Sequence, residues 1–239
     1  MNTLDQRARI AGFAYLLCVL IAPFRLIYIP GTLFTDDATT TIRNIAMHEA
    51  LFRLGIFGDL LICIIQLAFV LALYRLLESV DRKQAGLMVI LGGVMVPVIY
   101  FINVMNDAAT LLLVRGTDFL SMFDESQRHA LAALFLKMHG QVTSAAMLYW
   151  GLWLFPLALL VLRSGFLPRL LGYGLILNGL AYVAQCLAWA LFPAWDDAIS
   201  RIAMPFQFVE ILFMLWLLVM GARSGFRRKA TDSMARANP

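Results

Sequence analysis

The sequence predicts an all-α membrane protein with six transmembrane helices. Of its 239 residues, 62% are hydrophobic and only 14% are charged, and the mean hydropathy is +0.80. A soluble domain is usually about half apolar and a quarter charged, so this chain has too few charges to cover a soluble surface. The apolar residues form long blocks, whereas the alternating segments of a β-barrel, roughly 10 residues each, are absent.

Six apolar blocks are long enough to cross a bilayer, which requires about 20 residues in a helix. They lie at about 10–29, 50–77, 85–114, 131–162, 170–192 and 202–222. The first block is longer than the apolar part of a cleaved signal peptide, so it is expected to be retained. Residues 1–229 are expected to form one transmembrane domain, and the polar tail 230–239 is expected to be disordered.

Short segments recur along the chain. Odd-numbered spans open with RARIAGF, RKQAGLM and PRLLGYG, and the sequence RSGF occurs at 163–166 and again at 223–226. These similarities indicate three related helical hairpins. Apolar helices also resemble one another by chance, so both interpretations stay open.

Basic residues between the spans predict the orientation. If the N-terminus is cytoplasmic, the cytoplasmic turns hold Arg75, Arg82, Lys83, Arg163 and Arg169 close to helix ends. Basic residues at such positions resist translocation, so both termini are expected in the cytoplasm. The net charge of +4 is spread between apolar blocks, and the absence of a basic domain argues against nucleic acid as a partner.

Several segments resemble a known family. They are ARIAGFAYLL, HEALFRLGIFGDLL, LALYRLL and GLWLFPLALLVLRSGFLPRLLGYGLILNGL. Over residues 10–190 they are similar to the bacterial family called domain of unknown function 4386. The resemblance implies a six-helix protein of the bacterial inner membrane, and it implies no reaction.

Ionisable and amide side chains inside the spans mark a candidate site. A charged side chain at the centre of a membrane costs roughly 2.5–3.5 kcal/mol on insertion scales, so it indicates a function or an internal partner. These side chains occur in the outer halves of the spans, above inner halves such as IIQLAFVLALY. We therefore expect an outward-open polar pocket. Its expected lining residues are Arg25, His48, Glu49, Arg53, Asp59, Asn103, Asn106, Asp107, Lys137, His139, Gln141, Gln207 and Glu210.

Four of these residues lie at a similar depth on four different spans, counted at about 1.5 Å per residue. They are Asp59, Asp107, His139 and Glu210. Three carboxylates and an imidazole could bind a divalent metal ion. A proton or polar-ligand site, and ion pairs with Arg25, Arg53 or Lys137, are the alternatives. Haem is disfavoured because its two axial ligands would be His48 and His139, which differ in depth.

The second span carries a polar stripe on one helical face. The stripe consists of His48, Phe52, Gly55, Asp59, Ile62 and Gln66. An unpaired carboxylate facing lipid is costly, so we expect this face to point into the bundle and Asp59 to contact a partner there. Residues 35–47, just before this span, are expected to form a short helix.

These features predict a polytopic membrane protein that binds a small polar ligand, an ion or a lipid headgroup. The alternatives are a metal-dependent intramembrane enzyme acting on a lipid or amphiphile, and a secondary transporter. The sequence contains no GxSxG elbow, P-loop or HExxH motif, so it does not decide between enzyme and binding protein. Beyond membrane lipid it specifies neither a partner nor an oligomeric state. The cysteines, Cys18, Cys63 and Cys186, are expected to be free thiols among apolar neighbours.

Overall fold

The computed structural model describes residues 3–222, and this part of the chain is almost entirely helical with no β-strand. Six helical stretches in it are long and apolar enough to cross a membrane, which confirms the predicted fold class. The stretches are Thr3–Leu33, Glu49–Leu77, Arg82–Arg115, Glu125–Ser164, Arg169–Leu191 and Pro193–Met220. The predicted tail 230–239 lies outside the described residues, and the grouping into three related hairpins stays a prediction.

Most spans are assembled from shorter helical elements, some of them π-helical. The first contains α1 (Thr3–Pro23), the π-helix η1 (Phe24–Tyr28) and α2 (Ile29–Leu33), and the second is α4 (Glu49–Leu77). The third contains α5 (Arg82–Met88), the π-helix η2 (Val89–Met95) and α6 (Val96–Arg115). The fourth contains α7 (Glu125–Leu152) and α8 (Leu154–Ser164), and the fifth is α9 (Arg169–Leu191). The sixth contains η4 (Pro193–Trp195), α10 (Asp196–Leu215) and the π-helix η5 (Trp216–Met220).

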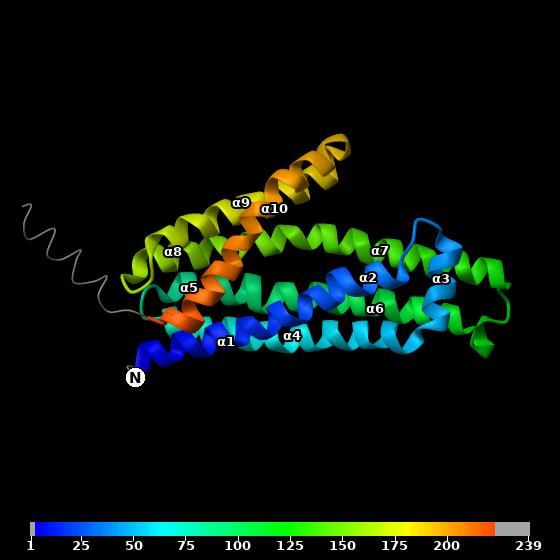
Figure 1. The fold of residues 1–239 in the computed structure, drawn as a ribbon, viewed down its shortest axis with the longest axis horizontal. Helices are drawn as coiled ribbons and strands as arrows, with labels where there is room; N and C mark the ends of the chain where they lie inside the picture. Colours follow the sequence, from blue (N-terminus) through cyan, green and yellow to red (C-terminus); the bar gives the residue numbers. More distant parts are fainter. Residues whose placement is uncertain (1–2, 223–239) are drawn as a thin grey trace, which may run out of the picture.

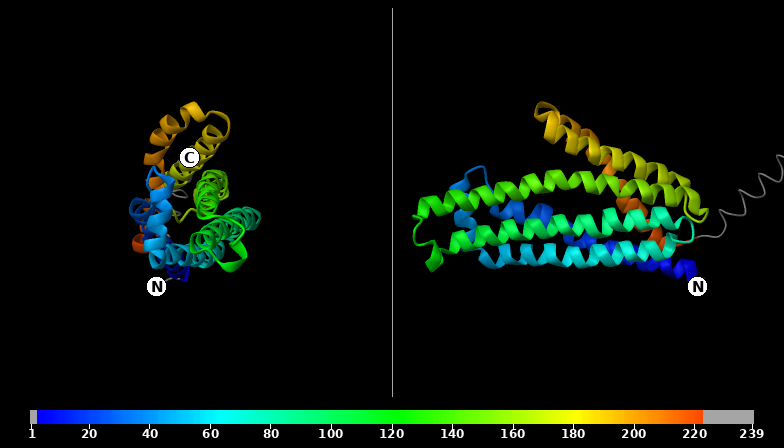
Figure 2. Two further views of the ribbon diagram at one scale, coloured as in Figure 1. Left: turned by 90° about the vertical axis from the view of Figure 1, so that its right-hand side faces the viewer. Right: turned by 180° about the vertical axis from the view of Figure 1, so that it is seen from behind.

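The long spans run side by side along the longest axis of the molecule (Figure 1). The N-terminus and the end of η5 lie at one end of the bundle, which we call the terminal end; the opposite end, with α3 (Ala38–Met47) and η3 (Asp118–Leu120), is the far end. The α9–α10 hairpin leans away from the other spans, and its tip stops short of the far end (Figures 1 and 2).

Two capped helices shape the far end. Asp37 accepts a hydrogen bond from the backbone N–H of Thr40 and so begins α3, which confirms the predicted short helix. Asp124 and Gln127 form a reciprocal capping box at the start of α7, which satisfies N–H groups that have no partner within the helix. His48 interrupts the helical backbone between α3 and α4, with φ −118° and ψ 40°.

An apolar core fills the terminal half of the bundle. Phe69 of α4 stacks on Tyr15 at a ring-centroid distance of 4.2 Å, and it meets the edge of Trp153 at 6.0 Å. Phe213 of α10 belongs to the same buried cluster. Outside the bundle, large apolar side chains such as Phe57 and Leu170 are exposed, as expected where lipid replaces water.

Candidate functional site

Arg25 is directed into the bundle by the π-helical segment η1. Pro23 precedes this segment and has no backbone N–H, so the hydrogen-bond ladder is broken here; the N–H of Ile29 then bonds the carbonyl of Phe24, five residues back. Of the five residues in η1 only Arg25 is buried. Gly55 on α4 allows the first span to approach closely here, since a Cβ at Gly55 would lie 2.7 Å from Cδ1 of Ile29.

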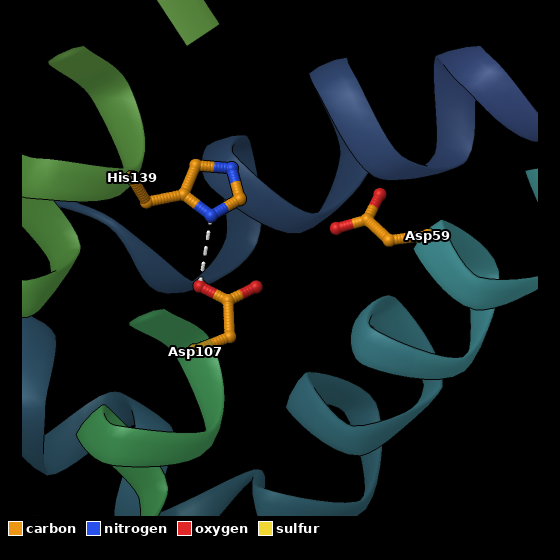
Figure 3. Close-up of side chains that lie close together, drawn as sticks. All are labelled: Asp59, Asp107 and His139. Atoms are coloured by element: carbon orange, nitrogen blue, oxygen red, sulfur yellow. Dashed lines mark ion pairs between the residues drawn. The ribbon is translucent and has the colours of Figure 1, made fainter. Parts of the chain in front are cut away.

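The guanidinium of Arg25 joins two carboxylates from different helices. Its Nε donates to Oδ2 of Asp59 at 2.8 Å, and its Nη2 donates to Oδ2 of Asp107 at 2.6 Å. Nη2 also lies 3.1 Å from Nε2 and 3.3 Å from Nδ1 of His139. Arg25, Asp59 and Asp107 are each at most 4% exposed. We call these four residues the charged cluster; Figure 3 shows its aspartates and His139.

The charges in this cluster are not balanced by Arg25 alone. One guanidinium faces two carboxylates, so neutrality requires one further proton or another positive charge at the cluster. Oδ1 of Asp107 lies 3.0 Å from Nδ1 of His139, yet no donor among the described residues is aligned with this buried oxygen. Oδ1 of Asp107 therefore keeps its capacity to accept a hydrogen bond or a cation.

Three residues of the cluster have the spacing of metal ligands. One ligand atom each from Asp59, Asp107 and His139 lies within 4.8 Å of the other two, and ligand distances near 2 Å would fit an ion between them. Nη2 of Arg25 approaches Asp107 and His139 at hydrogen-bond distance. A metal ion at this position would therefore require the Arg25 side chain to move.

Amide and hydroxyl groups extend the cluster on one side. Asn103 donates to Oγ1 of Thr143 at 3.0 Å, and Asn106 donates to Asn103 at 3.4 Å. Asn103 and Thr143 line a cavity of about 20 Å³ together with Arg25, Asp59 and His139. This volume suits about one water molecule, so the cluster borders a space for a single small species.

The structure places Glu210 in a separate group. Its Oε2 accepts a hydrogen bond from the hydroxyl of Tyr15 on α1, and its Oε1 accepts one from Nδ2 of Asn178 on α9 at 2.8 Å. Counting residues inward from the outer end of each helix predicted that Glu210 lies at the depth of His139 and beside it. The α9–α10 hairpin is inclined and ends short of the far end (Figure 1), so equal counts on α10 and α7 do not give equal positions.

A central cavity of about 430 Å³ has Tyr15 and Glu210 in its wall, and each of the six spans contributes to that wall. Leu26, Tyr100 and Trp150 line both this cavity and the small cavity beside the charged cluster. The complete lining is Tyr15, Cys18, Val19, Ala22, Pro23, Leu26, Ile27, Ile62, Gln66, Val96, Tyr100, Trp150, Trp153, Tyr182, Gln207, Glu210 and Ile211.

The remaining residues of the predicted pocket lie outside the charged cluster. Glu49 pairs with Arg53 at 2.7 Å and with Arg115 at 3.6 Å near the surface of the far end. His48 and Lys137 are exposed. His48 leaves the predicted stripe because the helical backbone is interrupted there, whereas Phe52, Gly55, Asp59, Ile62 and Gln66 are all buried on one face of α4.

Gln141 and Gln207, two further amides of the predicted pocket, form hydrogen bonds to other spans. Gln141 accepts a hydrogen bond from Nε1 of Trp189, and Gln207 donates to Gln185 at 3.1 Å. Gln207 lines the central cavity, whereas Gln141 lines neither of the two cavities.

Several residues of the site were not anticipated from the sequence. Asn178 is an amide inside an apolar span. The criterion that selected Asn103, a polar side chain within a membrane span, therefore also applied to Asn178. Thr143 follows His139 by four residues and therefore shares its face. Tyr15, Trp150 and Tyr182 gave no signal, because aromatic residues in a membrane helix are as common in packing as in binding.

The family described as "Domain of unknown function (DUF4386)" has a sequence model that matches residues 10–221. The chain belongs to this family. The match extends through the sixth span, so both Glu210 and the charged cluster lie within the family region. Searches of curated proteins and of solved structures found no match. The family's description names no activity, so the function must be argued from the site.

Proposed function

We propose that this member of the family binds a small amphiphilic ligand in its central cavity, between the six spans. The volume of the cavity, about 430 Å³, carries the proposal, because binding sites for small molecules commonly measure about 300–1,000 Å³. Such sites have mostly apolar walls with a few polar groups. Here the polar groups are Gln66, Gln207 and Glu210 among aliphatic and aromatic neighbours.

The charged cluster supports this function by fixing one wall of the cavity. Arg25 holds η1 against α4 and α6 through its two aspartates. Leu26, the next residue of η1, lines the cavity. Leu26 and Ile27 line the cavity and are also exposed on the outside of the bundle, so an amphiphile could enter beside them from the membrane.

Filling the cavity with protein atoms tests the proposal. Ala22 lines the cavity, and Ala68 is exposed on the outer surface of α4, so Ala22→Phe and Ala68→Phe form a matched pair. Native mass spectrometry of protein extracted in a neutral detergent would report amphiphiles that stay bound. We expect a bound species in the wild type and in Ala68→Phe, and its loss in Ala22→Phe. Equal occupancy in the two variants, or no bound species at all, would contradict the proposal.

A metal-dependent membrane enzyme is a second candidate, supported by the spacing of Asp59, Asp107 and His139. These residues would hold the ion once Arg25 had moved, and a bound metal ion would supply an activated water molecule. The unaligned Oδ1 of Asp107 suits such a ligand. Elemental analysis of the purified protein decides this. Stoichiometric zinc, manganese or iron that is lost in His139→Ala supports the enzyme, and a metal content equal in both proteins contradicts it.

A further inference from the structure

Glu210 differs from the two buried aspartates in having no cationic partner. Asp59 and Asp107 share Arg25, whereas Glu210 accepts hydrogen bonds from neutral groups, among them those of Tyr15 and Asn178. Within residues 3–222, no lysine, arginine or histidine forms an ion pair with Glu210. A carboxylate charge inside a membrane protein is costly without a positive charge nearby, so Glu210 is stabilised either by a proton or by a cation bound beside it.

Glu210 lines the central cavity, and so do five aromatic side chains. They are Tyr15, Tyr100, Trp150, Trp153 and Tyr182. The ring of Trp150 lies 6.2 Å from that of Tyr100 and 5.9 Å from that of Tyr182, measured between centroids. The faces of aromatic rings attract cations, with tryptophan the strongest, and such rings are used to recognise quaternary ammonium groups. No lysine or arginine lines this cavity.

We propose that the ligand of the central cavity is an organic cation with apolar substituents, held by the carboxylate of Glu210 and the faces of the surrounding aromatic rings. This inference rests on the proposed binding function and specifies the class of ligand. A fatty-acid anion would be repelled by Glu210, and a neutral lipid would leave its charge unbalanced. An inorganic ion is far smaller than a cavity of about 430 Å³ and would leave its apolar walls without contacts.

Two helices hold the Glu210 carboxylate in place for this role. Tyr15 on α1 donates to one oxygen, and Asn178 on α9 donates to the other at 2.8 Å. Hydrogen bonds to an ionised group are stronger than those between neutral groups. The carboxylate is therefore already oriented, and a cation can approach it from the cavity without a rearrangement of these helices.

A pair of compounds of the same shape tests the class of ligand. Benzyltrimethylammonium and neopentylbenzene differ in a positive nitrogen against a neutral carbon. Binding to the protein in lipid nanodiscs is followed by tryptophan fluorescence, because Trp150 and Trp153 line the cavity. Glu210→Gln removes the charge while keeping a hydrogen-bonding side chain. We expect it to weaken binding of the cation at least about tenfold, equivalent to 1.4 kcal/mol, with little effect on the neutral compound.

Trp150→Leu provides a second variant that keeps the carboxylate, and it is expected to weaken cation binding more than neutral binding. Trp189→Leu is its control, since Trp189 lies outside the cavity lining. If cation and neutral compound bind with equal affinity and Glu210→Gln changes neither, the ligand class is wrong while the binding function stands. If neither compound binds the wild type, the ligand class is contradicted, and the mass-spectrometric test above decides the binding function separately.

Discussion

Arg25 connects three membrane spans through one side chain. It lies on η1 in the first span and pairs with Asp59 on α4 and Asp107 on α6. A buried ion pair is weak support for net stability, because the desolvation of both charges opposes their attraction. Removing one partner is a different matter, because it leaves the opposite charge buried and unpaired. Arg25 is the member whose loss would leave two such charges.

We therefore expect Arg25→Gln to destabilise the protein by about 3–5 kcal/mol, the range found when a buried pair is broken. Asp59→Asn is expected to cost less, because Arg25 and Asp107 remain as a balanced pair. Arg53→Gln serves as the control. Arg53 pairs with Glu49 at the surface, and such pairs contribute about 1 kcal/mol or less. Thermal unfolding in detergent should rank the three variants in this order, and equal losses from Arg25→Gln and Arg53→Gln would contradict the role of Arg25.

At the scale of single residues, the sequence predicted the interior position of Asp59 and its possible pairing with Arg25, and the structure confirms both. The cost of a lone charge in lipid was sufficient for that prediction. The place of Glu210 could not be predicted, because a count along one helix gives depth but neither the tilt of that helix nor the direction of the side chain. The partner residue Tyr15 lies 195 positions away in the sequence.

Helices α7 and α9 approach each other through a pair of glycines. A Cβ added at Gly151 would lie 2.6 Å from the carbonyl oxygen of Gly179, and one added at Gly179 would lie 3.1 Å from the carbonyl oxygen of Gly151. Small residues allow helix backbones in membranes to approach closely. The position of α9, which carries Asn178 and Tyr182, therefore depends on these two glycines.

Gly151→Ala is expected to destabilise the protein by about 1–3 kcal/mol, the usual cost of overpacking, since α7 and α9 must separate. Gly140→Ala on the same helix is the control. A Cβ at Gly140 meets nothing within 4 Å, and alanine favours a helix over glycine by up to about 1 kcal/mol. Thermal unfolding should show a lower midpoint for Gly151→Ala only. Equal midpoints for the two variants would show that the glycine contact is not tight.

The start of α7 should respond to acid through its cap. Hydrogen bonds from the Ser126 side chain and the Gln127 backbone lower the pKa of Asp124 from its ordinary value of 3.8. Because the pKa is lowered in the folded state, the cap is fully effective above the ordinary value and is lost as the pH falls through the lowered one. We expect the protection factors of the amides in the first turn of α7, which compare each exchange rate with the intrinsic rate at the same pH, to fall below about pH 4.

Asp124→Asn separates capping from ionisation, because asparagine also caps helices but does not titrate. In this variant the protection factors at the start of α7 should no longer depend on pH in that range. An acid-induced loss of protection that persists unchanged in Asp124→Asn would assign the effect to another group.

At the scale of elements, the apolar blocks predicted the spans because a membrane helix needs about 20 apolar residues wherever it lies in the bundle. The π-helical segments were not predicted. Whether a turn is π-helical or α-helical depends on which N–H group bonds each carbonyl. The same apolar composition is compatible with both, so the sequence does not distinguish them. This difference matters at Arg25, which η1 turns inward while Leu26, Ile27 and Tyr28 remain exposed.

The whole molecule separates polar from apolar character along its length. The terminal half holds the aromatic core around Phe69 and Phe213, and the charged cluster lies nearer the far end, as the asymmetric polarity of the spans predicted. The inclination of the α9–α10 hairpin could not be read from the sequence, because it depends on close contacts such as that between Gly151 and Gly179. It is this inclination that separates Glu210 from the charged cluster.

The orientation of the whole bundle follows from its basic residues, and it decides which side of the membrane the site faces. At the terminal end, Arg163 pairs with Asp81 at 2.8 Å, and Arg7 donates to the carbonyl of Arg75. Basic residues next to helix ends favour the cytoplasm, so we expect the terminal end to be cytoplasmic and the far end, nearer to the charged cluster, to face outward.

Single cysteines in a background without Cys18, Cys63 and Cys186 test this orientation. Met122, 92% exposed at the far end, and Ser79, exposed in the turn after α4, are suitable positions. A maleimide that does not cross membranes should label Met122→Cys on intact cells, and it should label Ser79→Cys only after the cells are permeabilised. The two positions lie on opposite ends of a bundle whose third span runs between them, so they must label oppositely if that span crosses the membrane.

Labelling of Ser79→Cys alone on intact cells would invert the orientation and place the charged cluster nearer the cytoplasmic face. Labelling of both on intact cells would contradict the six-span topology itself, because no arrangement of a membrane-crossing third span exposes both positions to one side.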